Sequence, residues 1–195
     1  MALTLVKETG SGLASANSYA DVTDGDSYFE GHLYASAWVA ALTATKTAAL
    51  VMATRLVDSQ FQFNGFRSNE GQALQWPRER CPDPDRNLVT ISALSPVLTN
   101  YVPSTSVPKA VVWAVCEMAR ELLLEDRTAA PAGEGISSSQ SSSSSHDASG
   151  GTSTQTSISY SKEDTRPVMS RVAQAMLAKY GGLIGGSGTV RLVRA

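Results

Sequence analysis

The sequence predicts a mainly α-helical protein: a small bundle of about four helices with an extended β-hairpin arm and a C-terminal tail strand. Three observations support this class. Long segments carry apolar residues at helical spacing, a polar Ser-rich run separates the last two of them, and the final residues alternate in polarity. With 195 residues and a hydrophobic fraction of 42%, the chain can bury one core of ordinary size.

The first helix is expected to begin after Thr23, with Asp26 three residues on completing a capping box. Acidic residues in this first turn also suit the positive end of the helix dipole. A short apolar turn is expected after the helix. The residues expected on the buried side of this region are Tyr28, Phe29, Leu33 and Trp38.

The second helix is expected at about Ala44–Ser59, with Thr43 as its N-cap. Projected around a helix, its apolar residues gather on one side, which indicates an amphipathic surface helix. The expected core-facing side consists of Ala49, Leu50, Met52, Ala53, Leu56 and Val57. The expected outer side consists of Thr47, Thr54, Arg55 and Asp58.

The strongest helix signal spans Val107–Asp126, where Ser106 can cap the helix and Pro108 is tolerated in the first turn. Its expected buried stripe consists of Val111, Val115, Met118, Ala119 and Leu122. Its polar face carries Lys109, Glu117 and Arg120. Trp113 and Leu124 also fall on this polar side. Either a loop of the same chain covers them, or they contact a neighbouring subunit.

Two other long segments lack a helical pattern. Residues 61–101 are expected to be irregular, because turn signals and prolines interrupt them. Residues 128–163 form a Ser-rich insertion of low complexity. Within it, Thr154–Tyr160 alternates like a strand and could be one arm of a long hairpin. Such a polar run buries little apolar surface, so a lone copy is not expected to hold one conformation.

The last helix is expected at Thr165–Tyr180, with Gly181 and Gly182 ending it as a glycine C-cap. A Gly-rich hinge then leads to a tail strand. This strand either adds to the sheet edge of a partner or pairs with the chain's own strands. Its candidate interface residues are Val190, Arg191, Leu192, Val193 and Arg194. The predicted domains are 1–127 plus 164–181, 128–163, and 182–195.

Titratable residues do not gather in a catalytic or metal-binding pattern. His32 and His146 are the two histidines, and neither has a partner at metal-ligand or nucleophile spacing. The Gly-rich run near the C-terminus follows a predicted helix, whereas a phosphate loop opens one. Cys81 and Cys116 are interpreted as reduced thiols, although a disulfide between them stays possible. We therefore expect no enzyme activity, no cofactor and no metal site.

The overall charge of the chain argues against tight binding of duplex DNA. Formal net charge is −2, whereas tight binding of duplex DNA depends on many phosphate contacts and usually on a basic excess. No apolar run approaches the roughly 18–20 residues of a membrane span, and the N-terminal residues do not follow a signal-peptide pattern. We therefore expect a protein that does not act at a membrane.

Five motifs follow one another along the chain: ANSYADVTDGDSYFEGHL, Trp38, TAALVMATRLVDS, GFRSNEGQALQWPR and VPKAVVWAVCEMARELL. In this order they resemble the head–tail adaptor family of tailed bacteriophages, also called head completion or connector proteins. The resemblance covers about residues 14–126, with a weaker match at the last helix. The matching residues before the last motif are Asn17, Ser18, Tyr19, Asp26, Tyr28, Phe29, Trp38, Ala53, Thr54, Arg55, Leu56, Asp58, Gly65, Arg67, Gln72, Leu74, Trp76, Pro77 and Arg78.

The resemblance implies a virion protein, made in the host cytoplasm, whose copies form a ring beneath the portal, usually a dodecamer. Its partners would be the portal protein, neighbouring copies, the downstream neck or tail-completion protein, and double-stranded DNA that passes without specific binding. Trp113, Leu124 and residues 190–194 are then candidate contacts with other subunits or the portal. The Ser-rich insertion departs from the family pattern, and copies of a hairpin there could pair around a ring.

Related sequences are sometimes labelled DnaT-like single-stranded-DNA-binding proteins, which supplies an alternative function in phage replication. That function needs a basic groove with aromatic rings for base stacking. The candidate rings are Tyr28, Phe61, Phe63, Phe66 and Trp76, and the candidate cations are Arg55, Arg67, Arg78 and Arg80. The other interpretation is that Phe61, Phe63 and Trp76 pack inside the protein.

Overall fold

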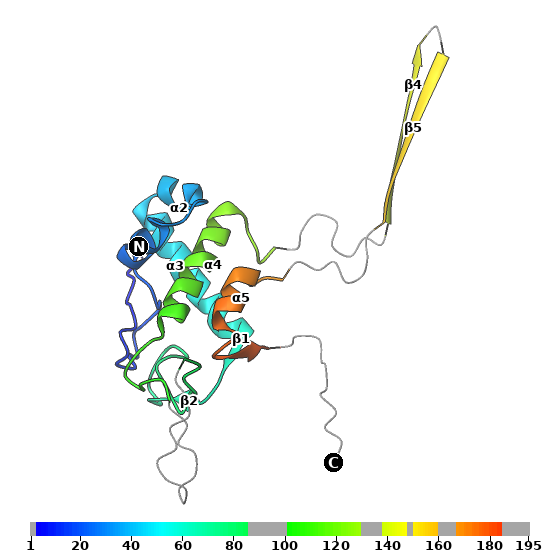
Figure 1. Cartoon of the computed structure of the whole chain (residues 1–195). Coiled ribbons are helices and arrows are strands. Elements are labelled where there is room, and N and C mark those ends of the chain that lie inside the picture. The colour runs from blue at the N-terminus through cyan, green and yellow to red at the C-terminus, as the bar shows by residue number, and fades with distance from the viewer. Residues whose placement is uncertain (1–2, 86–100, 130–137, 148–149, 160–166, 185–195) are drawn as a thin grey trace, which may run out of the picture. The chain divides into compact units, whose positions relative to one another are not determined.

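The computed structural model describes residues 3–85, 101–129, 138–147, 150–159 and 167–184 (Figure 1). The chain divides into two compact units. The first consists of Met1–Arg127 with Met169–Ala195, and the second is Thr128–Val168. The domain boundaries expected from the sequence stay a prediction, and each unit is described by itself.

The first unit contains five helices and four short strands among its described residues. Its helices are α1 (Val22–Phe29), α2 (Ser36–Ala40), α3 (Thr43–Gln60), α4 (Lys109–Leu124) and α5 (Arg171–Leu177). Its strands are β1 (Phe61–Phe63), β2 (Phe66–Arg67), β3 (Arg78–Glu79) and β6 (Gly181–Leu183). The two longest helices, α3 and α4, pack on each other, and α5 packs on α4 (Figure 1).

The short strands pair in antiparallel fashion across long stretches of sequence. β1 pairs with β6, so that Phe61 lies opposite Leu183 and Phe63 opposite Gly181. β2 pairs with β3. The β1–β6 pair holds the last described residues next to β1, which directly follows α3. Gly181 therefore belongs to a strand, and the expected glycine C-cap at this position is wrong.

The predicted fold class, a bundle of about four helices with a hairpin arm and a tail strand, is wrong. The described residues form five helices and three antiparallel strand pairs. Whereas α3 has 18 residues and α4 has 16, α1, α2 and α5 have 8, 5 and 7. Such short helices make only about one to two turns, so they cover the long pair without running its length. The fold is helix-rich but mixed, because part of the expected loop forms strands.

Several helix ends differ from the sequence prediction. The N-caps of α3 and α4 are Leu42 and Pro108, not the expected Thr43 and Ser106. The capping box of α1 lies at Asp21 and Asp24, two residues before the expected pair, and both of its hydrogen bonds are present. α1 ends at Phe29, so the helical spacing that placed Leu33 inside does not apply there. α5 is capped by Ser170, whose hydroxyl accepts from the N–H of Ala173 at 3.1 Å.

The core of the first unit is formed by apolar side chains of all five helices, of β1, of the segment before α1 and of the loop between β2 and β3. Its largest fully buried apolar members include Trp38, Leu50, Val57, Trp76, Val111, Val115, Met118 and Leu177. Thr54, which was expected to face outward, is buried because its Oγ1 accepts from the N–H of Tyr19 at 3.3 Å. Cys81 and Cys116 are buried free thiols, and burial raises the pKa of Cys116 to about 12.

The second unit contains an antiparallel hairpin. β4 (Ser138–Asp147) pairs with β5 (Gly150–Ser159), so that Ser138 lies opposite Ser159 and Asp147 opposite Gly150. Among the described strands, neither outer edge of this hairpin is paired. An isolated two-stranded hairpin is only marginally stable in water. The expected interface residues of the C-terminal tail, 190–194, lie outside the described residues.

Candidate functional site

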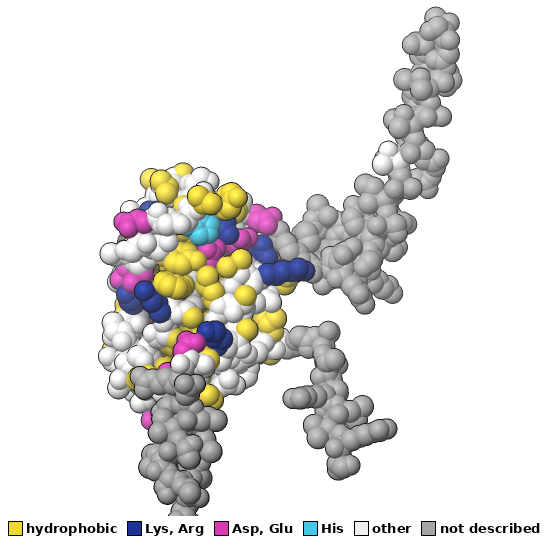
Figure 2. Space-filling model, viewed as in Figure 1, with side chains coloured by type: hydrophobic (Ala, Val, Ile, Leu, Met, Phe, Trp, Pro, Cys, Tyr) yellow, Lys and Arg dark blue, Asp and Glu magenta, His cyan; other side chains and the backbone are white. Residues whose placement is uncertain are grey.

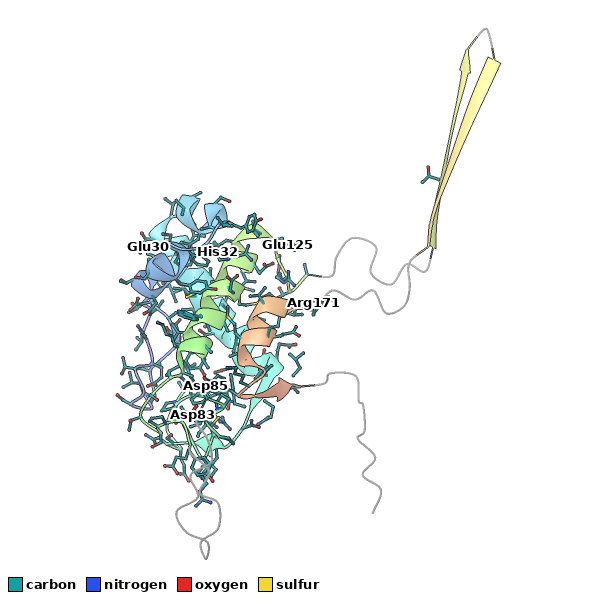
Figure 3. The ribbon with its side chains drawn as sticks, in the orientation of Figure 1. Glu30, His32, Asp83, Asp85, Glu125 and Arg171 are labelled. Atoms are coloured by element: carbon teal, nitrogen blue, oxygen red, sulfur yellow. The ribbon has the colours of Figure 1, made fainter. Side chains whose placement is uncertain are left out.

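A cleft of about 550 Å³ opens between α1 and α4. Its lining residues are Thr23, Asp24, Ser27, Tyr28, Gly31, His32, Lys109, Val112 and Trp113. Figure 2 shows the histidine of this region beside hydrophobic side chains on the face toward the viewer, and Figure 3 places His32 near the end of α1. The cleft is formed because α1 ends early and the chain then turns away toward α2.

Aromatic rings and a cation form one side of the cleft. Lys109 and Trp113 lie one turn apart on α4, and the Lys109 Nζ lies 4.7 Å from the Trp113 ring centroid. The ring of Tyr28, from α1, lies 5.7 Å from that of Trp113. Trp113 is nevertheless 38% exposed. An incoming flat or apolar group can therefore contact its ring.

The buried carboxylate of Glu117 does not line the cleft but binds two of the side chains that do. The Tyr28 hydroxyl donates to Glu117 Oε1 at 2.8 Å, and Arg120 Nε donates to Oε2 at 3.1 Å. His32 Nε2 lies 3.0 Å from Oε1. Burial, and then the hydrogen bond to Glu117, raises the pKa of Tyr28. The sequence pattern placed Glu117 on the outer face of its helix, but these three partners satisfy it inside.

His32 has a partner on each ring nitrogen. The Tyr34 N–H donates to His32 Nδ1 at 3.1 Å, so this nitrogen is an acceptor and Nε2 carries the hydrogen toward Glu117. The polar ends of Tyr28 and His32 are thus occupied, while their rings line the cleft. Across the parts of the chain that the structure describes, no group of three or more His, Cys, Asp or Glu could hold a metal ion. The arrangement suits recognition by ring contacts and charge.

A second surface feature lies next to this cleft and was missed by the sequence pattern. The apolar patch, as we call it, consists of Leu33, Tyr34, Val39 and Leu42, which are exposed by 91%, 74%, 71% and 76%. Figure 2 shows hydrophobic side chains at the upper end of the first unit, where Figure 1 places α2. Within α2, Trp38 packs inward and Val39 points outward. The patch could have been predicted from the short length of α2, because this helix of five residues buries only Trp38 and leaves Val39 exposed.

The two described residues that were predicted to lie at an interface, Trp113 and Leu124, differ in where the structure places them. Trp113 forms one wall of the cleft and Leu124 is exposed at the end of α4, so both are accessible. Tyr28 and Lys109 contact Trp113 but do not cover it. The structure does not bring Leu124 into the cleft. An interface role for these two residues stays a prediction.

Most of the candidate base-stacking residues are not available for stacking. Phe61, Phe63 and Trp76 are buried, which confirms the interpretation that they pack inside the protein. Arg78 is also buried, and its guanidinium donates to several backbone carbonyls. A smaller exposed group is left, in which the Arg80 guanidinium lies 5.8 Å from the ring centroid of Phe66.

No described helix is long and apolar enough to cross a membrane. The fold and the cleft define a helix-rich protein with short antiparallel strand pairs and accessible aromatic, cationic and apolar side chains. A family model described as "Putative DnaT-like ssDNA binding protein" matches residues 3–195. The chain belongs to this DnaT-like family. Neither a curated protein nor a solved structure matches it significantly.

Proposed function

We propose that this protein is a structural component of a tailed-phage neck: a head-to-tail adaptor that forms a ring beneath the portal and lines the DNA channel. It would connect the portal to the next neck or tail protein within the virion. The resemblance of residues 14–126 to adaptor proteins supports this proposal. The structural observation that carries it is the apolar patch, because exposed apolar surface of this kind is typical of protein–protein contacts.

The charge of the chain is compatible with this role. A channel protein that passes DNA must not hold it, and phosphate contacts by Lys and Arg are the main source of affinity for DNA. The formal net charge of −2 supplies no basic excess for such contacts. The cleft likewise offers recognition chemistry, with Trp113 and Lys109 on one wall, and we propose no catalytic role for it.

A second candidate function is binding of single-stranded DNA, and the description of the DnaT-like family favours it over the adaptor role. One local observation is compatible with it: the exposed ring of Phe66 with Arg80 above it and Arg67 beside it in the sequence. Base stacking on aromatic rings is tolerant of sequence, so a single exposed ring can contribute. The burial of Phe61, Phe63 and Trp76 makes this platform small.

One pair of measurements separates the two functions. Light scattering gives the mass of the protein alone and mixed with the portal of the same phage, and a fluorescence titration with labelled single-stranded DNA at moderate salt gives its affinity for DNA. We expect a ring on the portal and no binding of DNA at micromolar concentration. Micromolar binding of single strands without association with the portal would contradict the adaptor proposal and support the second candidate.

Two matched variants sharpen this comparison. Val39→Asp places a charge in the apolar patch, and we expect it to prevent ring formation and leave DNA binding unchanged. Phe66→Ala removes the exposed aromatic side chain near Arg80. We expect this variant to assemble into the ring of subunits as the wild type does. Both side chains are exposed, so neither change is expected to unfold the protein. The opposite pattern, loss of DNA binding in Phe66→Ala alone, would favour the DNA-binding function.

A further inference from the structure

We propose that the cleft between α1 and α4 is the docking site for the apolar patch of a second copy of this chain. This inference rests on the proposed assembly of copies and names the surfaces that meet. Leu33 and Tyr34 of one copy would enter the cleft and contact Tyr28 and Trp113 of the other. The contact buries apolar groups that the single chain leaves exposed.

The size of the cleft fits side chains better than a whole element. At about 550 Å³ it lies within the ~300–1,000 Å³ range of binding pockets. Gly31 lines it without a side chain, and a Cβ at this position would meet no atom within 4 Å. The chain's own Leu33 stays 91% exposed. The patch therefore does not fill the cleft of its own molecule.

Charge complementarity identifies a second copy as the occupant. Lys109 lies at the edge of the cleft, and within the described parts of the chain its ammonium contacts the Trp113 ring and forms no ion pair. Glu30 is exposed three residues before Leu33, and it likewise forms no ion pair with a described residue. Figure 3 shows Glu30 and His32 near the same end of α1. A copy that places Leu33 in the cleft carries the Glu30 carboxylate toward Lys109.

The same site is poorly suited to a nucleic acid. The acidic side chain of Asp24 lines the cleft, and Lys7 is held in an ion pair with it. Lys109 is then the one lining cation without an ionic partner among the described residues. Strong binding of a phosphate backbone uses several such cations. An apolar segment preceded by one carboxylate matches the cleft more closely.

Charge reversal tests the contact in the full chain. Sedimentation velocity over a range of concentrations measures self-association of the wild type, Glu30→Lys, Lys109→Glu and the double variant. We expect each single variant to weaken association by about 10-fold or more, and the double variant to recover most of it. Equal association in all four proteins, or no recovery in the double variant, would overturn the proposal. Both side chains are exposed, so circular dichroism should show unchanged folding.

Cross-linking of single-cysteine variants tests the same contact by geometry. One copy carries Leu33→Cys and the other Val112→Cys, and a short thiol cross-linker is added to the mixture. We expect a cross-linked pair in the mixture and little in either variant alone. The native Cys81 and Cys116 are buried, and Ser59→Cys, exposed on α3, replaces Leu33→Cys in the control mixture. Equal cross-linking in the control mixture, or none in the test mixture, would overturn the docking site.

The docking site and the adaptor function can be contradicted separately by these experiments. They need the protein alone, whereas the adaptor proposal is tested by binding to the portal. A protein that binds the portal as a ring but shows no effect of charge reversal within that ring would keep the adaptor function and lose this docking site. A protein that self-associates through Glu30 and Lys109 but does not bind the portal would keep this docking site and lose the adaptor function.

Discussion

Arg78 shows at the scale of one residue how a motif that invites a functional interpretation can be structural. Its guanidinium donates to the carbonyls of Asn64 at 2.8 Å, Gly65 at 2.6 Å and Phe63 at 3.2 Å. It also donates to the main-chain and side-chain oxygens of Gln75. The planar fork of arginine suits several acceptors at once. Arg78 therefore joins β1 and the turn after it to the loop before β3.

We predict that Arg78→Ala lowers the free energy of unfolding by about 3 kcal/mol or more, because the carbonyls of Phe63, Asn64 and Gly65 lose the donor that the buried Arg78 side chain supplies. Arg78→Lys should recover part of this loss, since an ammonium keeps the charge without the fork. Urea unfolding measures both. The control is Arg80→Ala, an exposed neighbour, expected to change stability by no more than about 0.5 kcal/mol. Equal losses at the two positions would contradict the buried role of Arg78.

Asp58 is a partly buried carboxyl in a network with the buried Tyr19. The Tyr19 hydroxyl donates to Asp58 Oδ1 at 2.7 Å, and the Gln75 N–H donates to Oδ2 at 3.0 Å. Burial raises the pKa of Asp58 to about 6, and these hydrogen bonds oppose the rise only in part. The folded protein therefore holds a proton on Asp58 at pH values where the unfolded chain has lost it.

This pKa shift predicts a pH dependence of stability. The stabilisation from protonated Asp58 is fully present below about pH 4 and is lost as the pH rises through about 6. We expect Asp58→Asn to remove this downward slope between pH 4 and 6. Urea unfolding of both proteins at pH 4, 5, 6 and 7 measures it, and the difference between the two curves cancels the other titrating groups. A constant difference across this range would exclude the shift.

At the scale of elements, Gly181 shows why β6 can pair closely with β1. A Cβ on Gly181 would lie 2.1 Å from the carbonyl oxygen of Gln62, a backbone atom that cannot move aside. A Cβ on Gly182 would meet no atom within 4 Å. Two adjacent glycines in one strand therefore differ in what they tolerate, although they look alike in the sequence.

We predict that Gly181→Ala destabilises the protein by about 2 kcal/mol or more through this clash, whereas Gly182→Ala changes stability by less than about 0.5 kcal/mol. Thermal unfolding of the two variants beside the wild type measures the contrast. Hydrogen exchange adds a local readout, because the N–H of Ile184 donates to Gln60 beside this strand pair. Similar behaviour of the two alanine variants would argue against the β1–β6 register.

The same scale shows what the sequence could predict. Helix periodicity located α3 and α4 well, because both helices are long. The apolar face of α4 is regular, whereas α3 buries Thr54 and exposes Met52, which was expected in the core. It failed at the short elements. α1 has only two turns, so a capping box two residues earlier changed both its start and its end. β1 and β6 are three residues each, and their pairing is a tertiary contact that local pattern does not encode.

The candidate site was predictable only in part for a related reason. Trp113 was noticed because a large ring on a polar helix face is unusual. Glu117 was assigned to solvent, since its partners, Tyr28 of α1 and His32 of the segment after α1, lie 85 or more positions away in the sequence. The apolar patch was missed because Leu33 was given to a helix that ends at Phe29. The error at Glu117 arose where distant segments meet, and the error at Leu33 arose at the end of a short helix.

At the scale of the whole molecule, the division into two units makes a prediction of its own. In the sequence, residues 130–166 belong to the second unit and connect α4 to α5, two helices of the first unit that pack on each other. We predict that replacing them with a ten-residue Gly/Ser linker keeps the thermal midpoint of the first unit within about 3 °C. The linker can span up to about 33 Å, and closing a shorter loop changes the free energy only slightly.

Calorimetry measures this replacement, and a single cooperative transition is expected in both proteins. The linker should leave binding to the portal unchanged if the first unit alone provides that contact. A large fall in the thermal midpoint would mean that the second unit stabilises the first.

The buried carboxylate under the cleft has a consequence for the rate at which an occupant is captured. Because Glu117 holds Tyr28 and His32 from beneath, the rings of the cleft are ordered during folding rather than at the moment of contact. A segment that binds in the cleft then loses its own conformational entropy, but the Tyr28 and His32 side chains of the cleft are already ordered. Capture would proceed in one kinetic phase whose rate rises linearly with concentration, and differences between occupants would appear mainly in how long each one stays.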